Sequence, residues 1–475
     1  MSDRTIVPTW RRPMETIRRW LPALQILGLI ACIGLVLWPQ LEWSFEAAKR
    51  YRGDEASDWK ATNVWLESAE CARESGAWLA ICDEGRLVPI SDRALADDPG
   101  HALVLALWAL AADRTILVID VAHLNLAINL AGLLLLAGLL LVLGSYASAV
   151  VLLLLGPYVF LEWFGTSPHW AFIGLTAMQP ILPLALIARW RRWVPPWASA
   201  GLILLGFLTL AFASLVREAI AQMTLVVTLG TLAWIAVASR ADGRRVAGLL
   251  VLALATLLAS QAARLTVALR DRVHPVVPAE LVATHGLAHT LYIGLGTVPN
   301  KFGLRYDDAV GREAAARVAP EVKYLSKDYF RVMWSLYFAR WAEDPIEVIR
   351  IYLEKSWSIL RNRIPDYFPP PWLFLSLALV VHYLCNGRAA SCGTAACDKR
   401  LAINLVCLAF VGLFFAQAVL AYPTRFYAAP LGAFTIVMLG VAIENLAHGA
   451  GRLVGSGRLP TSFRTHSKSS GGSLP

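Results

Sequence analysis

Long apolar runs separated by short polar connections make up most of this 475-residue chain. A helix needs about 20 mostly apolar residues to cross the hydrocarbon core of a bilayer. We predict ten such helices, at residues 21–38, 122–144, 147–163, 169–188, 197–216, 222–238, 246–263, 371–385, 401–421 and 428–447. The pattern therefore predicts an all-α polytopic membrane protein.

Two long polar segments interrupt this series of spans. The first covers residues 40–121 and the second covers 264–370, far more than a connection between two helices needs. The predicted organisation is a basic N-terminus (1–20), a membrane core (21–263) that includes the first segment, the large second segment, C-terminal spans (371–447) and a disordered tail (448–475). Because loops on a rigid scaffold often carry function, we expect the functional site in these segments.

Both segments contain helical patterns of their own. Residues 61–79 have helix-like apolar spacing, and HALVLALWALA at 101–111 is too short to span, so we predict helices on the membrane surface. Aromatic residues recur at helical spacing between 330 and 341, which is typical of an interfacial helix or of a helix packed on a neighbour. Another helix should begin at Asp344, with Pro345 in its first turn and Glu347 completing a capping box.

Composition supports the membrane assignment, and charge predicts the orientation. The chain is 57% hydrophobic and 16% charged, with a mean hydropathy of +0.55, which excludes an ordinary soluble protein. If the first span is an uncleaved anchor with its N-terminus inside, the inner segments hold 18 Lys and Arg against four acidic residues. We therefore expect both termini in the cytoplasm. Positive charge spread over short loops also argues against nucleic-acid binding.

The seven cysteines divide by predicted compartment. Cys71 and Cys82 share the first outer segment, so we predict that they form a disulfide in an oxidising periplasm. Two others lie in spans, where a thiol behaves as a small hydrophobe. The remaining three flank an inner loop at spacings of seven and five, which does not suit a metal site. No metal or other cofactor is expected.

Acidic residues follow the first span closely, in RYRGDEASDW at 50–59. One of these acids can act as a general base if a cleft raises its pKa, and the candidates are Asp54 and Glu55, with Asp58 nearby. The simpler interpretation is a solvated acidic loop. Further along, ADDPGH at 96–101 reads as a turn that opens the short surface helix at His101.

A short connection between the last two spans, AYPTRFYAAP at 421–430, carries an arginine against the positive-inside trend. Arg425 lies between two tyrosines, Tyr422 and Tyr427. Its guanidinium can clamp a phosphate through two hydrogen bonds. The alternative is an arginine whose side chain reaches the lipid headgroups. Both interpretations place the charge at the membrane surface.

The second segment contains AHTLYIGLGTVPNKFGLRYDD at 288–308. Its glycines permit tight backbone, and Asp307 and Asp308 can bind a hydroxyl or a cation. His285 and His289 are four residues apart but lack the glutamate of a zinc-binding HExxH motif.

Taken together, the layout resembles the GT-C superfamily of membrane glycosyltransferases, notably the branch related to protein O-mannosyltransferases and lipid A aminoarabinose transferases. The resemblance covers most of the chain and rests on three motifs: GDEASDW (53–59), HALVLALWALA (101–111) and PTRFYAAP (423–430). It departs from the family in placing about a dozen residues between the first span and its acid, and in having DDPGH where an HPP-like signature is common.

The resemblance implies a transferase of the bacterial cytoplasmic membrane that moves a sugar from a polyprenyl-phosphate donor to an envelope glycan, lipid or protein. Asp54 would activate the acceptor, with Glu55 as its rival, and Arg425 would contact the donor phosphate. Substrate-binding residues would also include Tyr427 and His101.

The resemblance also implies that the segment at 288–308 forms a loop over a cleft, in which Asp307 or Asp308 binds sugar hydroxyls and His289 also contacts substrate. A lipid or solute transporter is the main alternative, although the spans carry few charges and show no repeat. A non-catalytic membrane scaffold is the third.

Overall fold

A computed structural model describes most of the chain. The described residues are 11–51, 60–92, 99–162, 165–239, 243–277, 286–361, 376–377, 379–380, 395–423 and 425–455. Within these ranges the side chains of 11–26, 60–61, 395–397, 425–426 and 448–455 are not described. This part of the chain is almost entirely helical and contains a single two-stranded hairpin, as expected for an all-α polytopic membrane protein.

Eight helical stretches in the described residues are long and apolar enough to cross a membrane. They lie at eight of the ten predicted positions, and the helices that form them are α1 (Arg11–Ala48), α4 (Val118–Leu143), α7 (Phe172–Met178) with α8 (Ile181–Trp190), α9 (Pro196–Val216), α10 (Glu218–Ala238), α11 (Gly243–Ser260), α18 (Ala395–Leu420) and α19 (Arg425–Gly455). The predicted span at 371–385 lies almost wholly outside the described residues.

The predicted span at 147–163 is interrupted. It forms α5 (Tyr146–Leu155) and the single turn α6 (Pro157–Phe160). The two helices meet at Gly156 and Pro157, where Pro157 has no backbone N–H and one helical hydrogen bond is missing. Each piece is too short to cross a bilayer by itself.

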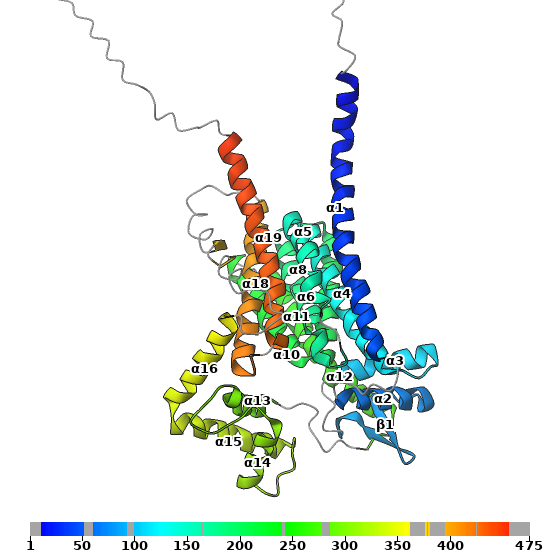
Figure 1. The fold of residues 1–475 in the computed structure, drawn as a ribbon, viewed down its shortest axis with the longest axis vertical. Helices are drawn as coiled ribbons and strands as arrows, with labels where there is room; N and C mark the ends of the chain where they lie inside the picture. Colours follow the sequence, from blue (N-terminus) through cyan, green and yellow to red (C-terminus); the bar gives the residue numbers. More distant parts are fainter. Residues whose placement is uncertain are drawn as a thin grey trace, which may run out of the picture.

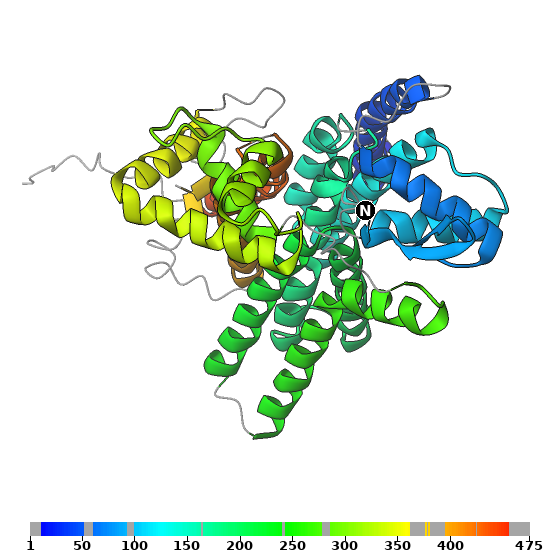
Figure 2. The ribbon, with the colours of Figure 1, turned by 90° about the horizontal axis from the view of Figure 1, so that it is seen from below.

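The polar segments gather at one end of the helical bundle (Figure 1). Helix α1 begins and α19 ends at the opposite end, far from both segments. Viewed from the polar end, the two segments lie on different sides of the bundle, which remains visible between them (Figure 2). We call residues 60–112 the first lobe, residues 286–360 the second lobe, and this end of the bundle the lobe end.

The first lobe packs two helices against a hairpin. Its elements are α2 (Lys60–Ser75), β1 (Ala80–Asp83), β2 (Arg86–Pro89), η2 (Ile90–Asp92) and α3 (Gly100–Ala112). The strands pair antiparallel, with Ala80 opposite Pro89. The predicted disulfide between Cys71 and Cys82 is confirmed and ties α2 to β1. Helix α12 (Ala262–Val273) supports the lobe from outside, because the buried guanidinium of Arg270 donates to the carbonyl of Leu79.

The second lobe consists of α13 (Gly286–Gly294), η4 (Leu295–Thr297), α14 (Asp308–Val318), α15 (Lys327–Glu343) and α16 (Pro345–Leu360). The predicted helix start at Asp344 is confirmed, since its carboxylate accepts the N–H of Glu347 at 3.0 Å. Glu347 does not complete the predicted capping box; its carboxylate accepts the N–H of Lys301 at 2.9 Å and pairs with Arg350. The predicted loop at 288–308 is partly wrong, because α13 occupies its first third.

One buried lysine joins the second lobe to the bundle. Lys355, on α16, is fully buried and donates to the carbonyls of Gly294, Leu420 and Ala421 at 3.0, 3.2 and 2.8 Å. The last two carbonyls close the C-terminal end of α18, where the helix dipole favours a cation. Burial lowers the pKa of Lys355 to about 7. A single side chain therefore holds α13, α16 and α18 together.

Small residues bring the bundle helices into close contact. A Cβ added to Gly132 of α4 would lie 2.3 Å from the carbonyl oxygen of Gly174 on α7. Asn129, one turn away, donates to the carbonyl of Trp170 at 2.7 Å and accepts the N–H of Gly174 at 3.0 Å. Close backbone approach and buried amide hydrogen bonds are typical means of packing helices within a membrane.

Candidate functional site

An apolar groove opens at the lobe end, where the second lobe meets the bundle. It has a volume of about 550 Å³ and lies between α10, α13 and α18. Its walls are mainly aliphatic, with Met223 and Val226 on one side, Leu287 and Leu291 on another, and Leu413 on the third. A space of this size and character suits a chain-like apolar ligand.

Arg217 and Tyr427 line the groove, together with the polar side chains of Glu218, Gln222, Thr290 and Gln417. Arg217 has an extended backbone (φ −157°, ψ 98°) between the end of α9 and the start of α10, so its side chain leaves the helix stack. One Nη of Arg217 donates to the hydroxyl of Tyr427 at 3.4 Å, and its guanidinium lies 5.2 Å from the ring centroid of Phe172. The positive end of the α10 dipole adds to this charge.

Aromatic rings surround this arginine on the bundle side. His169 lies 4.9 Å from Phe172 and 6.1 Å from Tyr427, centroid to centroid, and Tyr427 lies 6.0 Å from Phe172. The Nδ1 of His169 is 2.7 Å from the hydroxyl of Ser167, which fixes the ring. A guanidinium held among rings has little competing water, and its attraction for an anion is correspondingly stronger.

A tyrosine of the second lobe stacks on a tyrosine of the bundle in the same region. Tyr306 lies on Tyr422 with ring centroids 4.1 Å apart and planes 10° from parallel. Burial raises the pKa of the Tyr306 hydroxyl, and so do Tyr427, Asp308 and Tyr422, whereas the charge of Arg217 opposes the rise. The lobe and the bundle therefore share one electrostatic environment around Arg217.

This arrangement can bind an amphiphilic anion. The groove accommodates an apolar chain, and Arg217 and Tyr427 offer donors to oxygen atoms. No cluster of three or more His, Cys, Asp or Glu side chains able to hold a metal ion occurs among the described residues.

The predicted catalytic acids, Asp54 and Glu55, lie outside the described residues, as does His285. Arg425 forms the first residue of α19, and its side chain is not described. Tyr427 follows two residues later and lines the groove, so the helix that carries the predicted phosphate-binding arginine begins beside the groove. The substrate-binding roles of Arg425 and Tyr427 stay predictions.

The structure places His101 in the interior of the first lobe. It is 1% exposed, its Nε2 lies 2.7 Å from Oδ1 of Asn125, and its ring stacks on Trp65 at 4.6 Å. The amide of Asn125 in turn donates to the carbonyls of Gly165 and Ser167. This geometry favours a structural role, in which His101 attaches the lobe to α4. Substrate binding by His101 stays a prediction.

His289 is likewise enclosed within the second lobe. Its Nδ1 lies 2.6 Å from the hydroxyl of Tyr329 and its Nε2 lies 3.0 Å from Oδ1 of Asp308. A Cβ on Gly311 would come within 2.7 Å of the ring, so only glycine leaves room for it. The carboxylate of Asp308 is 58% exposed, while His289 is 1% exposed. If either residue meets a substrate, it is the aspartate, oriented by the histidine behind it.

Asp307 forms the N-terminal cap of α14. Its Oδ1 accepts the N–H of Ala309 at 2.8 Å. A capping role of this kind satisfies one of the N–H groups that a helix start leaves unpaired. The predicted contact between Asp307 and substrate stays a prediction, and the observed hydrogen bond accounts for the residue without it.

Sequence reasoning missed Arg217, His169, Tyr306 and Tyr422 as site residues. Arg217 stands in the short connection between the predicted fifth and sixth spans, on the same predicted side as Arg425. It breaks the positive-inside trend in the same way. That signal was available for Arg217. The aromatic residues carry no comparable signal, because tyrosine and histidine near span ends are common.

Comparison of the chain with protein-family models, with curated proteins and with solved structures found no match. The resemblance to membrane glycosyltransferases therefore depends on the sequence motifs alone.

Proposed function

We propose that this protein is a glycosyltransferase of the bacterial cytoplasmic membrane that uses a polyprenyl-phosphate sugar as donor. The observation that carries the proposal is the mainly apolar groove whose lining includes Arg217, hydrogen-bonded to Tyr427. A polyprenyl phosphate combines an apolar chain, which suits the aliphatic walls, with an anion, which suits the guanidinium. In the proposed orientation the two lobes lie on the periplasmic face and both termini lie in the cytoplasm. The excess of Lys and Arg in the predicted inner segments favours this orientation.

The proposed reaction needs a cation at the leaving group and a base at the acceptor. An acceptor oxygen or nitrogen attacks the anomeric carbon, the bond from that carbon to the phosphate oxygen breaks, and the phosphate keeps the electron pair. Arg217, with Arg425 by family resemblance, stabilises the charge that develops there. The acceptor proton passes to Asp54 or Glu55, the acids of the GDEASDW motif.

A lipid transporter is the second candidate, and the same groove favours it. A groove that binds a lipid phosphate serves translocation as well as chemistry. The experiment must therefore follow the bond to the sugar as well as the lipid.

The test uses the full-length protein in nanodiscs with a panel of radiolabelled polyprenyl-phosphate pentoses, hexoses and aminosugars, plus envelope extract as acceptor. We expect release of free polyprenyl phosphate with at least one donor. The Asp54→Asn, Glu55→Gln and Arg425→Gln variants test the catalytic assignment. Arg331→Gln is the matched control, since Arg331 is exposed and pairs only locally with Asp328 on α15.

Two outcomes would count against the proposal. In the first, every donor stays intact although the protein still crosslinks a photoreactive polyprenyl phosphate to α13 or α18. That result would show lipid binding without sugar transfer. Movement of the same lipid across a vesicle bilayer without cleavage would establish the transporter instead.

A further inference from the structure

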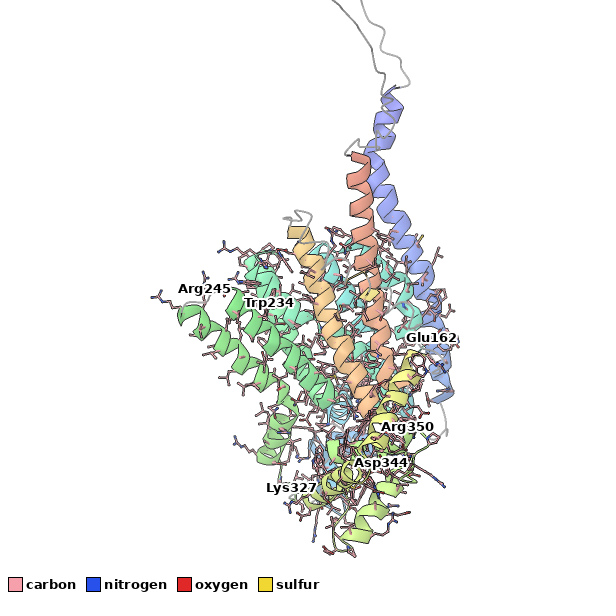
Figure 3. The ribbon with its side chains drawn as sticks, turned by 90° about the vertical axis from the view of Figure 1, so that its left-hand side faces the viewer. Glu162, Trp234, Arg245, Lys327, Asp344 and Arg350 are labelled. Carbon is pink, nitrogen blue, oxygen red and sulfur yellow. A yellow bond between two sulfur atoms is a disulfide. The ribbon has the colours of Figure 1, made fainter. Side chains whose placement is uncertain are left out.

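A second cavity lies at the end of the bundle away from the lobes, in the connection between α8 and α9. It has a volume of about 400 Å³ and is lined by Arg189, Arg192, Trp193, Val194, Pro195 and Pro196. Figure 3 shows which end this is: Trp234 and Arg245 lie there, opposite Lys327, Asp344 and Arg350 of the second lobe. Trp190, next to Arg189, packs edge-on against Trp234 at 5.0 Å.

The backbone of this connection places an arginine where glycine is usual. The N–H of Trp193 donates to the carbonyl of Ala188 at 2.9 Å, and Arg192 has a left-handed backbone with φ +57°. Helices that end in this way generally have glycine at the left-handed position, because a side chain there is strained. The chain therefore keeps a guanidinium at this position despite its conformational cost.

The two cavity arginines have no acidic partner within the part of the chain that the structure describes. Among the described residues, no carboxylate forms an ion pair with Arg189 or Arg192, whereas their neighbour Arg191 lies 3.8 Å from Asp398 of α18. Pro195 and Pro196, which line the cavity, mark the start of the 21-residue helix α9. The positive end of that helix faces the same space as the two guanidiniums. The cavity is thus suited to an anion.

The surroundings of the cavity indicate a lipid as the source of that anion. Trp197, Leu204 and Leu208 lie on one face of α9 and are 79%, 61% and 59% exposed. They form an apolar track that starts at the cavity and runs along a membrane-spanning helix. Tryptophans at the end of such a helix are typical of headgroup depth. A free phosphate ion has no apolar chain that could contact this track.

We propose that this cavity binds the phosphate of an anionic glycerophospholipid. Arg189 and Arg192 contact the phosphate oxygens, Trp193 lies beside the headgroup, and an acyl chain follows Trp197, Leu204 and Leu208. Basic pockets at the ends of membrane helices bind anionic headgroups in this way. The proposal does not depend on the proposed transferase function, because the site lies at the other end of the bundle.

The test measures binding of phosphatidylglycerol to the full-length protein in mild detergent, by native mass spectrometry and by the shift in melting temperature. We expect stabilisation by phosphatidylglycerol and much less by phosphatidylcholine. In the double variant Arg189→Gln/Arg192→Gly, the affinity for phosphatidylglycerol should fall about tenfold or more. Without lipid, Arg192→Gly should melt no lower than the wild type, because glycine suits the left-handed backbone, so lost binding is not lost folding.

Arg191→Gln is the matched control. It removes one positive charge from the same connection, but from the residue that pairs with Asp398, and it should bind phosphatidylglycerol as the wild type does. Equal binding by the wild type and the double variant would overturn the proposal. Equal stabilisation by phosphatidylcholine would also overturn it, since the headgroup charge would then not be recognised. Equal stabilisation by inorganic phosphate alone would show an anion site that does not recognise lipid.

Discussion

The guanidinium of Arg217 lies among aromatic rings at the lobe end of the bundle, whereas those of Arg189 and Arg192 lie exposed in the opposite cavity. Around Arg217, Phe172 and Tyr427 replace water, so its interaction with an anion is only weakly screened. Arg189 and Arg192 are exposed to solvent, where salt screens their attraction for an anion. On the two proposals, the same residue type would serve selective binding of one ligand at one end and attraction for lipid headgroups at the other.

The two sites also differ in how the chain builds them. Arg217 is enclosed by elements far apart in sequence, including the start of α19 and a tyrosine of the second lobe. The opposite cavity is lined by six residues that all lie within the stretch 189–196. The lobe-end site should therefore be sensitive to distant substitutions that displace the second lobe, and the opposite cavity should not.

Removing the enclosed arginine is the strongest test of this contrast. Arg217→Ala should lower the rate of sugar transfer by roughly 100- to 1,000-fold, the usual effect of losing a preorganised donor to a developing oxyanion. Arg217→Lys keeps the charge without the planar fork and should be intermediate. Arg192→Gly should leave transfer unchanged. Assays of polyprenyl phosphate release measure all three, and equal rates in Arg217→Ala and wild type would remove Arg217 from the proposed mechanism.

Removing the Lys355 side chain, which connects the second lobe to the bundle, should have the next largest effect. Lys355→Met removes the donor shared by three carbonyls and should destabilise the protein by about 3 kcal/mol. Lys301→Met is the control, since Lys301 is exposed and pairs with Asp344 at the surface. Denaturation in mixed detergent micelles reports the difference. If the two variants have the same free energy of unfolding, the three carbonyls find other donors and Lys355 does not hold the second lobe to the bundle.

Packing of the bundle helices should be sensitive to one added methyl group at Gly132 of α4 and insensitive to one at Gly138 of the same helix. Gly132→Ala places a Cβ against the carbonyl of Gly174 and should cost about 2 kcal/mol of stability. Gly138→Ala, on the same helix, meets nothing within 4 Å and should be neutral or slightly stabilising. Melting temperatures of the two variants compare the sites directly. Equal melting temperatures would mean that α4 and α7 separate at low cost.

The lowered pKa of Lys355 predicts a smaller effect of pH. Below about pH 7 both folded and unfolded chains hold the proton, so stability does not change through this group. Between pH 7 and its unfolded value of 10.5 the unfolded chain binds more protons, and stability should rise with pH, by about 1.5 kcal/mol from pH 7 to 8.5. The difference between wild-type and Lys355→Met stability curves isolates this contribution. A difference that stays constant over that range would contradict it.

The spans were predictable because each is determined by its own residues. Within a bilayer the backbone must satisfy its hydrogen bonds internally, so a long apolar run becomes a helix whatever its neighbours are. Eight predicted runs do so. The run at 147–163 shows the limit of that rule, since it divides into α5 and α6 at Gly156 and Pro157, where one backbone donor is missing.

The candidate site was only partly predictable. His289 and Asp308 looked like substrate ligands because polar residues in a glycine-rich segment suit a binding loop, yet a histidine bonded on both sides within a lobe has the same sequence signature. Arg217 carried a signal in its position at the end of a predicted span. Its aromatic surroundings carried none, because they join residues more than 250 positions apart, from His169 to Tyr427.

By itself the sequence determined the membrane class, the position of most spans, the helix start at Asp344 and the pairing of Cys71 with Cys82, all of which depend on residues close together in the chain. Only the tertiary structure decided that the second lobe docks through Lys355, that a groove opens beside it, and that Arg217 lines the groove. Local patterns set which backbone groups must be satisfied and how. Which side chains contact each other depends on how the formed helices pack together, and apolar helix surfaces can pack in many ways.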